Sequence, residues 1–239
     1  MSIKIEEIYQ STWEHYQKAK KNVAKRMILE HSADAISNVI PGFDAEKLDF
    51  GSYDKENYAV LFVDMRNSTL RAKQVGAEKT FLTMHVFLPA LLEVVKYYHG
   101  KVIDIMGDGI MVFWGGTQAR ESENMTNALA VKNAGLCGRD MLKICKKVIN
   151  EIIIKEKLGP AVNIGIGVTF DSVIVTKVGI ASFFDVKAFG DCINDASKYS
   201  SKVCNKVKVS KKVKNLWPKS PNGNIHFTPI HGENAYYLE

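Results

Sequence analysis

The sequence predicts an α/β sandwich, in which a mixed and mostly antiparallel sheet carries helices on its faces. Three observations indicate this class. A continuous apolar run over residues 58–63 is typical of a strand that is buried on both faces. Two apolar segments, 101–106 and 110–114, flank a Gly-Asp-Gly turn and predict a hairpin. Longer segments with apolar residues at helical spacing separate the predicted strands. The chain of 239 residues is 46% hydrophobic, which is enough to form a core.

The first predicted element is a helix over residues 3–31. An apolar residue recurs there every three or four positions, at Ile5, Tyr9, Trp13, Tyr16, Val23 and Met27. This stripe could pack on the body of the protein or on a second copy, and packing within its own domain is favoured. The polar segment 41–57 reads as a connector. We therefore expect residues 1–56 to hold a helix and connector, and residues 57–239 to form the main domain.

The strand at 58–63 ends at Asp64, and the remaining elements follow it in order. These are a helix at about 78–98 that Pro89 interrupts or kinks, the hairpin strands, a long helix at 122–156, a strand pair at 162–168 and 172–179, and a turn with a helix at 189–203. Asp191 is a candidate N-cap of that last helix. Two or three short strands close the chain.

The net charge of +6 favours a polyanionic partner, without choosing among nucleotide, nucleic acid and membrane surface. The four cysteines form no CxxC pair, so we expect reduced thiols in a cytoplasmic protein. No apolar run approaches the ~18 residues of a membrane span. Acidic residues follow the first Met where a signal peptide would be apolar, so we expect no export and no membrane partner.

Asp64 and Asp108 are the first candidate site residues. Asp64 ends a buried strand, and Asp108 lies in a hairpin turn that could sit beside that strand. A turn role alone would also account for Asp108. Two neighbouring carboxylates repel each other, and divalent cations remove that repulsion. Two such ions serve phosphoryl transfer, and the turn at 65–69 could bind a polyphosphate through its backbone N–H groups.

Four segments together resemble the catalytic domain of class III nucleotidyl cyclases. They read VLFVDMRNST, KVIDIMGDGIMVFW, NIGIGV and FGDCINDASK, and they occur in the family's order and spacing. The resemblance covers residues 57–116 and 162–200. It implies a class III cyclase fold with a ferredoxin-like core, so that residues 57–239 would be the catalytic domain. It also implies a nucleoside triphosphate substrate, two divalent metal ions (Mn²⁺ or Mg²⁺), and a head-to-tail homodimer with active sites at the interface.

The resemblance also assigns roles by position in this sequence. The implied metal ligands are Asp64, Asp108 and the carbonyl of Met65, the implied phosphate-binding residues are Asn67, Ser68 and Thr69, and the implied catalytic residues are Asn194 and Lys198. Asn194 would orient the ribose. Lys198 stands where the family usually has a transition-state arginine, and lysine keeps the charge without the bidentate fork.

Asp104 and Lys187 occupy the positions that read the base in this family. Adenylyl cyclases have a lysine and an acidic residue there, so the charges in this chain are swapped. An ionised carboxylate only accepts hydrogen bonds and an ammonium only donates. The pair suits uracil or cytosine, while adenine offers no carbonyl to Lys187 and guanine is not excluded. Alternatively, Asp104 and Lys187 pair with each other and read nothing.

The compact layout resembles the stand-alone pyrimidine cyclases of bacterial antiphage (Pycsar) signalling. That resemblance implies conversion of UTP or CTP to cUMP or cCMP, which would activate a separate effector without direct contact. The alternatives are an adenylate or guanylate cyclase, a catalytically weak nucleotide-binding module, and a basic nucleic-acid-binding domain. The last leaves Asp64 and Asp108 unexplained, so no nucleic-acid partner is expected. The lysines at 202–214 read mainly as a solvated face, and no lysine near the C-terminus is assigned to the terminal phosphates.

Overall fold

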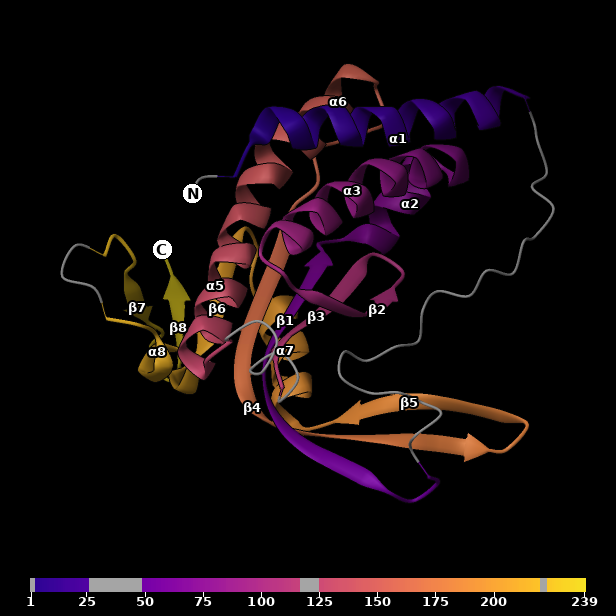
Figure 1. Ribbon diagram of the computed structural model, residues 1–239. Coiled ribbons are helices and arrows are strands. Elements are labelled where there is room, and N and C mark those ends of the chain that lie inside the picture. The colour runs from indigo at the N-terminus through magenta and orange to yellow at the C-terminus, as the bar shows by residue number, and fades with distance from the viewer. Residues whose placement is uncertain (1–2, 26–48, 117–124, 220–222) are drawn as a thin grey trace.

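The computed structural model describes residues 3–25, 49–116, 125–219 and 223–239. Within these ranges eight strands form one sheet, in the order β2-β3-β1-β4-β6-β8-β7, with β5 paired to β4 (Figure 1). The strands are β1 Tyr53–Met65, β2 Lys101–Met106, β3 Gly109–Gly115, β4 Ile164–Ile180, β5 Phe183–Phe189, β6 Lys206–Ser210, β7 Phe227–Pro229 and β8 Ala235–Leu238. Only the β4–β6 pair is parallel among the described strands. The predicted mixed, mostly antiparallel sheet is confirmed.

Helices cover both faces of this sheet. They are α1 Ile5–Lys25, α2 Ser68–Val75, α3 Ala77–Tyr97, α5 Asn127–Ile144, a π-helical turn Cys145–Ile149, α6 Asn150–Lys155, α7 Asp191–Ser201 and α8 Lys211–Leu216. Successive residues of a strand point to opposite faces. Accordingly Ala59, Leu61 and Val63 of β1 join the core under α3 and α5, while Tyr58 and Val60 join a smaller cluster with α7. The apolar run at 58–63 is therefore buried on both faces, as the sequence predicts.

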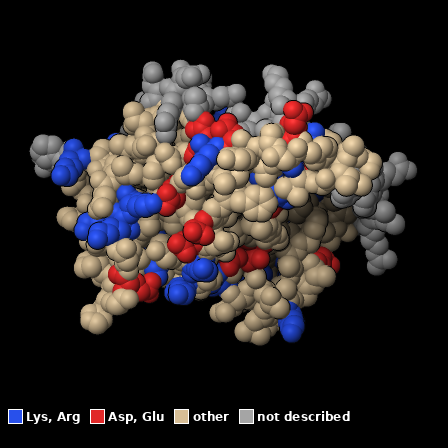
Figure 2. All heavy atoms as spheres, turned by 90° about the horizontal axis from the view of Figure 1, so that it is seen from below, with Lys and Arg blue, Asp and Glu red and all other residues tan. Residues whose placement is uncertain are grey.

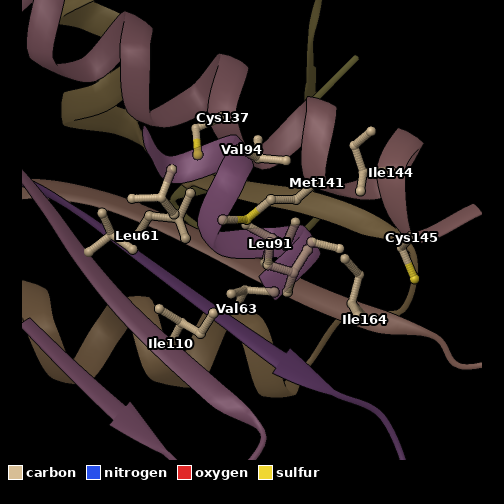
Figure 3. Close-up of a cluster of buried hydrophobic side chains, with 14 of the residues drawn as sticks. Leu61, Val63, Leu91, Val94, Ile110, Cys137, Met141, Ile144, Cys145 and Ile164 are labelled. Carbon is tan, nitrogen blue, oxygen red and sulfur yellow. The ribbon is translucent and has the colours of Figure 1, made fainter. Parts of the chain in front are cut away.

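The larger core lies between the sheet and two helices (Figure 3). Side chains of β1, β3 and β4 meet those of α3 and α5 there, among them Leu61, Val63, Ile110, Ile164, Leu91, Val94, Cys137, Met141 and Ile144. α3 is long and apolar enough to cross a membrane, and it is alone in this among the described helices. Eight of its residues are buried within the protein, which is typical of a core helix.

α1 lies across α3 and reaches the end of α6 (Figure 1). Ile3, Ile8, Tyr16 and Ala19 belong to the main core, so the favoured packing of this helix on its own domain is confirmed. The last six residues of the predicted helix, 26–31, lie outside the described residues. β1 begins at Tyr53, inside the predicted connector, and the boundary after residue 56 stays a prediction.

The predicted strand pair at 162–168 and 172–179 is wrong. These residues form one continuous strand, β4, whose first part pairs with β1 and whose second part pairs with both β1 and β5. The segment between the two predicted strands contains no glycine or proline, and none of its residues has a positive φ, so nothing breaks the strand. β4 therefore extends away from the body and forms an arm with β5 (Figure 1).

Two helix predictions also need correction, and a third is narrowed. α3 is not interrupted at Pro89, which lies inside the helix, so only the alternative of a kink there stays a prediction. The long helix begins at Asn127, where the Thr126 side chain caps it by accepting from the Leu129 N–H at 3.1 Å, and a π-helical turn interrupts it. Residues 122–124 of that prediction lie outside the described part of the chain. The N-cap of α7 is Gly190, and Asp191 is the first helical residue.

Two glycines of the NIGIGV segment place α7 close to the sheet. A Cβ on Gly167 would lie 2.0 Å from the carbonyl oxygen of Ala196, and one on Gly165 would lie 2.0 Å from that of Ser200. Any larger residue would push the helix away from β4. These two glycines therefore set the distance between α7 and the sheet. α7 carries two of the candidate site residues.

The cysteines within the described ranges are free, with Cys137, Cys145 and Cys192 buried and Cys204 exposed. Burial raises the pKa of the Cys145 thiol to about 12 and that of Cys192 to about 11. These thiols stay protonated and unreactive at neutral pH. None of the four cysteines forms a disulfide in the described part of the chain.

Candidate functional site

The structure brings Asp64 and Asp108 together. Asp64 lies opposite Gly109 in the antiparallel register of β1 and β3, and Asp108 occupies the turn immediately before that glycine. Burial raises the pKa of the Asp64 carboxyl, the charge of Asp108 raises it further, and Arg66 opposes both effects. Such a pair of carboxylates is a costly arrangement unless a cation is shared between them.

The donor atoms at this pair fit a hard divalent cation. Asp108 Oδ2 is buried and has no hydrogen-bond partner among the described residues, which leaves one carboxylate oxygen unsatisfied. Carboxylate and carbonyl oxygens are the ligands that Mg²⁺ and Mn²⁺ prefer, and Met65 follows Asp64 directly. The described part of the chain has no cluster of three or more His, Cys, Asp or Glu side chains. Further ligands would have to come from water or from substrate oxygens.

The predicted phosphate-binding residues line an open hollow beside the carboxylates. Its volume is about 450 Å³, and its lining is Asp64, Met65, Arg66, Asn67, Ser68, Thr69, Leu70 and Lys73. Asn67 is the N-cap of α2 in a left-handed conformation (φ 57°), and its side chain makes no capping bond. The first N–H groups of a helix have no intrahelical partner, so those of Ser68 and Thr69 can donate to an anion.

Arg71 holds this turn in place, a role that the sequence analysis missed. Its guanidinium is buried and donates to Thr83 Oγ1 (3.0 Å) and to the carbonyls of Leu158 (3.2 Å) and Pro160 (3.4 Å). These contacts tie α2 to α3 and to the loop before β4. An arginine within a polar helix gives no sequence signal of burial.

Asn194 and Lys198 lie one helical turn apart on α7, and both are exposed. The Lys198 ammonium is 3.8 Å from Asp195, which is a loose surface pair. Neither residue lines the hollow at Asp64. The structure of one chain therefore does not bring the predicted catalytic residues to the predicted metal ligands.

A second cavity, of about 90 Å³, brings Asp104 and Lys187 together. Its lining is Ile103, Asp104, Met111, Asp185, Val186, Lys187 and Ala188. A register shift between Val102 and Asp104 interrupts the β2–β3 ladder, and such a bulge re-aims the side chains beside it. The two predicted base-reading residues thus face one small space between the hairpin and β5.

Lys187 pairs with Asp185 rather than with Asp104. The Lys187 ammonium lies 2.5 Å from Asp185 Oδ2, and no contact joins it to Asp104 among the described residues. The alternative that Asp104 and Lys187 pair with each other is therefore not what the structure shows. Asp185 was missed in the sequence, although two-residue periodicity places it on the same face of the strand as Lys187.

The arm formed by β4 and β5 carries an exposed apolar surface. Large side chains on it remain open to solvent, including Ile174, Val178, Ile180, Phe184 and Phe189, which are 36%, 45%, 66%, 43% and 53% exposed. The Lys177 ammonium lies 3.9 Å from the Phe184 ring centre, close to the tip of the arm. The register places Ile174, Val178, Ile180 and Phe189 on one face of the arm, and an exposed apolar face is typical of an interface with another protein.

Most of the lysines at 202–214 have partners within the chain. Lys208 is buried and pairs with Glu233, and Lys212 pairs with Asp171. Lys206 lies 4.2 Å from the ring centre of Tyr237, and Lys214 lies 4.1 Å from that of Tyr236. Figure 2 shows positive and negative side chains interspersed on the face seen from below in Figure 1. Mixed charges of this kind are typical of a solvated face.

Comparison with known proteins gives one family. The model of the adenylate and guanylate cyclase catalytic domain matches residues 50–234. Among solved structures, the adenylyl cyclase CyaB from P. aeruginosa is similar with a TM-score of 0.66 and 19% identity, over 79% of this chain and 96% of that one. The guanylyl cyclase Cya2 gives a TM-score of 0.62 and 18% identity, over 77% of this chain and 91% of that one. At these identities the two structures support the fold alone.

Two curated relatives are similar in sequence, and both are named cytidylate cyclase. The protein from Staphylococcus aureus is 24% identical over 157 residues, which is 64% of this chain and 36% of the relative. The protein from Escherichia coli is 26% identical over 144 residues, 59% of this chain and 31% of the relative. The matched region thus spans about a third of each relative's length.

Proposed function

The chain belongs to the family of adenylate and guanylate cyclase catalytic domains, and from this we propose that it cyclises a pyrimidine nucleoside triphosphate, CTP or UTP. The products would be the 3′,5′-cyclic nucleotide and pyrophosphate. Class III cyclase domains bind nucleotide substrates and generally use divalent metals. The observation that carries the proposal is the Asp64–Asp108 pair, with its unsatisfied buried oxygen, beside the hollow at residues 65–69.

The residues of this chain would divide the reaction between binding and charge stabilisation. Asp64, Asp108 and the Met65 carbonyl would hold two divalent ions, Mn²⁺ or Mg²⁺, which when bound assist deprotonation of the ribose 3′-hydroxyl and neutralise phosphate oxygens. The N–H groups of Asn67, Ser68 and Thr69 would bind the phosphates. The 3′-oxygen forms a bond to the α-phosphorus, the bond to pyrophosphate breaks, and the hydroxyl proton leaves to solvent.

Two residues of α7 would complete the site from a second copy of the chain. Asn194 would orient the ribose, and Lys198 would stabilise the charge that develops on the α-phosphate. Class III cyclase domains commonly dimerise. A head-to-tail dimer is supported by the absence of Asn194 and Lys198 from the lining of the hollow in their own chain and by the exposed apolar arm. Each interface would then hold one carboxylate pair and one α7 from opposite chains.

The base would be read in the cavity of Asp104 and Lys187. Asp104 accepts, and Lys187, held by Asp185, donates. Cytosine offers an amino group to the carboxylate and its ring nitrogen and carbonyl to the ammonium, whereas uracil offers N3–H and a carbonyl. The names of the two curated relatives favour CTP over UTP. We place the reaction in antiphage signalling in the cytoplasm, where the cyclic nucleotide would activate a separate effector.

A second candidate is a nucleotide-binding module with little turnover, which Lys198 in place of an arginine favours. Purified protein incubated with ATP, GTP, CTP or UTP and Mn²⁺ separates the candidates, with products identified by mass spectrometry. We expect a cyclic pyrimidine nucleotide. A purine product would overturn the base assignment, and binding of CTP without any product would favour the module.

A further inference from the structure

Arg66 places a guanidinium directly against the carboxylate pair. It follows Met65 at the end of β1, and its backbone N–H donates to the carbonyl of Asn163 at 2.8 Å. Its side chain turns back, so that Nη2 forms an ion pair with Asp64 Oδ2. The Arg66 side chain is 18% exposed and that of Asp64 is 29% exposed, so this pair is largely shielded from water.

The pairing leaves the site incompletely satisfied. Arg66 compensates the charge of Asp64, but Asp108 Oδ2 and Arg66 Nε are both buried without a hydrogen-bond partner in the described ranges. One monovalent group therefore serves two carboxylates. A divalent cation carries twice the charge and would compete with Arg66 for the Asp64 carboxylate.

The other end of the guanidinium contacts α7. Arg66 Nη1 donates to the carbonyl oxygen of Ser201 at 2.7 Å, at the last residue of that helix. α7 also carries Asn194 and Lys198. A single side chain therefore joins the carboxylate pair of one proposed active site to the helix that would serve the other.

We propose that Arg66 is the resident counter-ion of Asp64, that a divalent cation displaces it, and that this displacement releases its contact with α7. The inference rests on the proposed metal site. If so, binding of a metal ion at the carboxylates makes the C-terminal end of α7 more mobile, because that end loses its hydrogen bond from Arg66. Arg66 is in this respect a positioning residue, which acts through Asp64 and Ser201.

Mn²⁺ titration of substrate-free protein by calorimetry tests the first half. Arg66→Met removes the competing charge, so we expect Mn²⁺ to bind about three- to tenfold more tightly than to the wild type. Arg139→Met, on α5, removes an equal charge elsewhere and should leave affinity near the wild-type value. Asp108→Asn should abolish tight binding. Equal or weaker Mn²⁺ binding by Arg66→Met, with Arg139→Met unchanged, would overturn the proposal.

Hydrogen exchange tests the link to α7. The amides of Lys202 and Val203 donate to Tyr199 and Ser200 over 3.3 and 3.4 Å, and these long bonds should respond when Ser201 loses Arg66. In the wild type, Mn²⁺ should speed their exchange. Arg66→Met should exchange fast with or without Mn²⁺. Arg66→Lys keeps the positive charge, but a single ammonium cannot contact both Asp64 and Ser201. This variant should therefore bind Mn²⁺ with near wild-type affinity, and its exchange at Lys202 and Val203 should not respond to Mn²⁺.

The two readouts do not require turnover. Mn²⁺-insensitive exchange in the wild type would overturn the link even if the protein makes a cyclic nucleotide. The predicted shifts in Mn²⁺ affinity and exchange would support the role of Arg66 even if no cyclic product forms, and the proposed function would then fail alone.

Discussion

The Lys187 ammonium lies 2.5 Å from a carboxylate oxygen of Asp185, while Asp104 lines the same cavity from the neighbouring hairpin. This arrangement keeps a positive group in a defined place and leaves Asp104 without a partner among the described residues. One ammonium and two carboxylates therefore line the cavity, and the carboxylate of Asp104 does not take part in the ion pair.

Exchanging the two charges tests whether this cavity selects the base. The double variant Asp104→Lys with Lys187→Asp restores the adenylyl-type arrangement. We expect kcat/KM for CTP and UTP to fall on the order of a hundredfold, because a site that hydrogen-bonds one base is left with mismatched donors and acceptors when its charges are exchanged. Use of ATP should rise. Steady-state kinetics with all four nucleotides measures the ratio, and unchanged discrimination would remove these residues from base selection.

Asp108→Asn should lower turnover while raising the stability of the metal-free protein. Turnover should fall by at least about a thousandfold, because the variant lacks one of two proposed metal carboxylates. Metal-free thermal stability should rise by roughly 1 kcal/mol, because the change removes the charge that raises the pKa of Asp64. Differential scanning calorimetry without metal gives the second value. Asp171→Asn, which breaks an exposed pair with Lys212, is the matched control and should keep normal turnover.

Gly167→Ala should displace α7. The added Cβ would meet the Ala196 carbonyl at 2.0 Å, so the helix must shift, at a cost of roughly 2–3 kcal/mol of unfolding free energy. Turnover should fall as well, because Asn194 and Lys198 move with the helix. Gly190→Ala is the milder control, since its nearest contact would be 3.1 Å away. Urea unfolding of both variants measures which loses more unfolding free energy. Equal stability of Gly167→Ala and Gly190→Ala would contradict the close packing of α7 on Gly167.

The attachment of α1 should weaken in acid. Hydrogen bonds from Lys20 and Tyr16, each 2.6 Å long, lower the pKa of the Glu156 carboxyl below its usual 4.5. A carboxyl with a depressed folded-state pKa contributes stability above the unfolded-state pKa and loses it as pH falls through the folded value. Glu156→Gln should therefore be less stable than the wild type at pH 7.

The difference between Glu156→Gln and the wild type should shrink as the pH falls below about 4.5, where the wild-type carboxyl begins to protonate. Urea unfolding curves at pH 7 and in acid measure it. A difference that stays constant down to the lowest pH at which the protein folds would show that the Glu156 charge is not responsible.

The sequence predicts those parts of the fold where local patterns agree with tertiary contacts. The run at 58–63 and the Gly-Asp-Gly turn predict β1 and the β2–β3 hairpin, and hence the neighbourhood of Asp64 and Asp108. The segment at 169–172 combines polar residues that also suit turns, so only pairing with β1 and β5 reveals a continuous strand.

The missed residues depend on contacts between distant segments. Asp185 matters because it reaches Lys187 beside a cavity that the β2 bulge helps to form. Arg71 and Arg66 both sit in polar stretches, where arginine is ordinarily solvated. Their acceptors include the main-chain carbonyls of residues 158, 160 and 201, and a carbonyl has no residue-type signature in a sequence.

β4 runs for 17 residues without a break. It pairs with β1 from Ile164 to Thr176 and packs against α7 at one end, while its other end forms half of the arm. The same strand therefore carries both the glycines against which α7 packs and the exposed arm, so a partner bound at the arm would contact the element that supports α7.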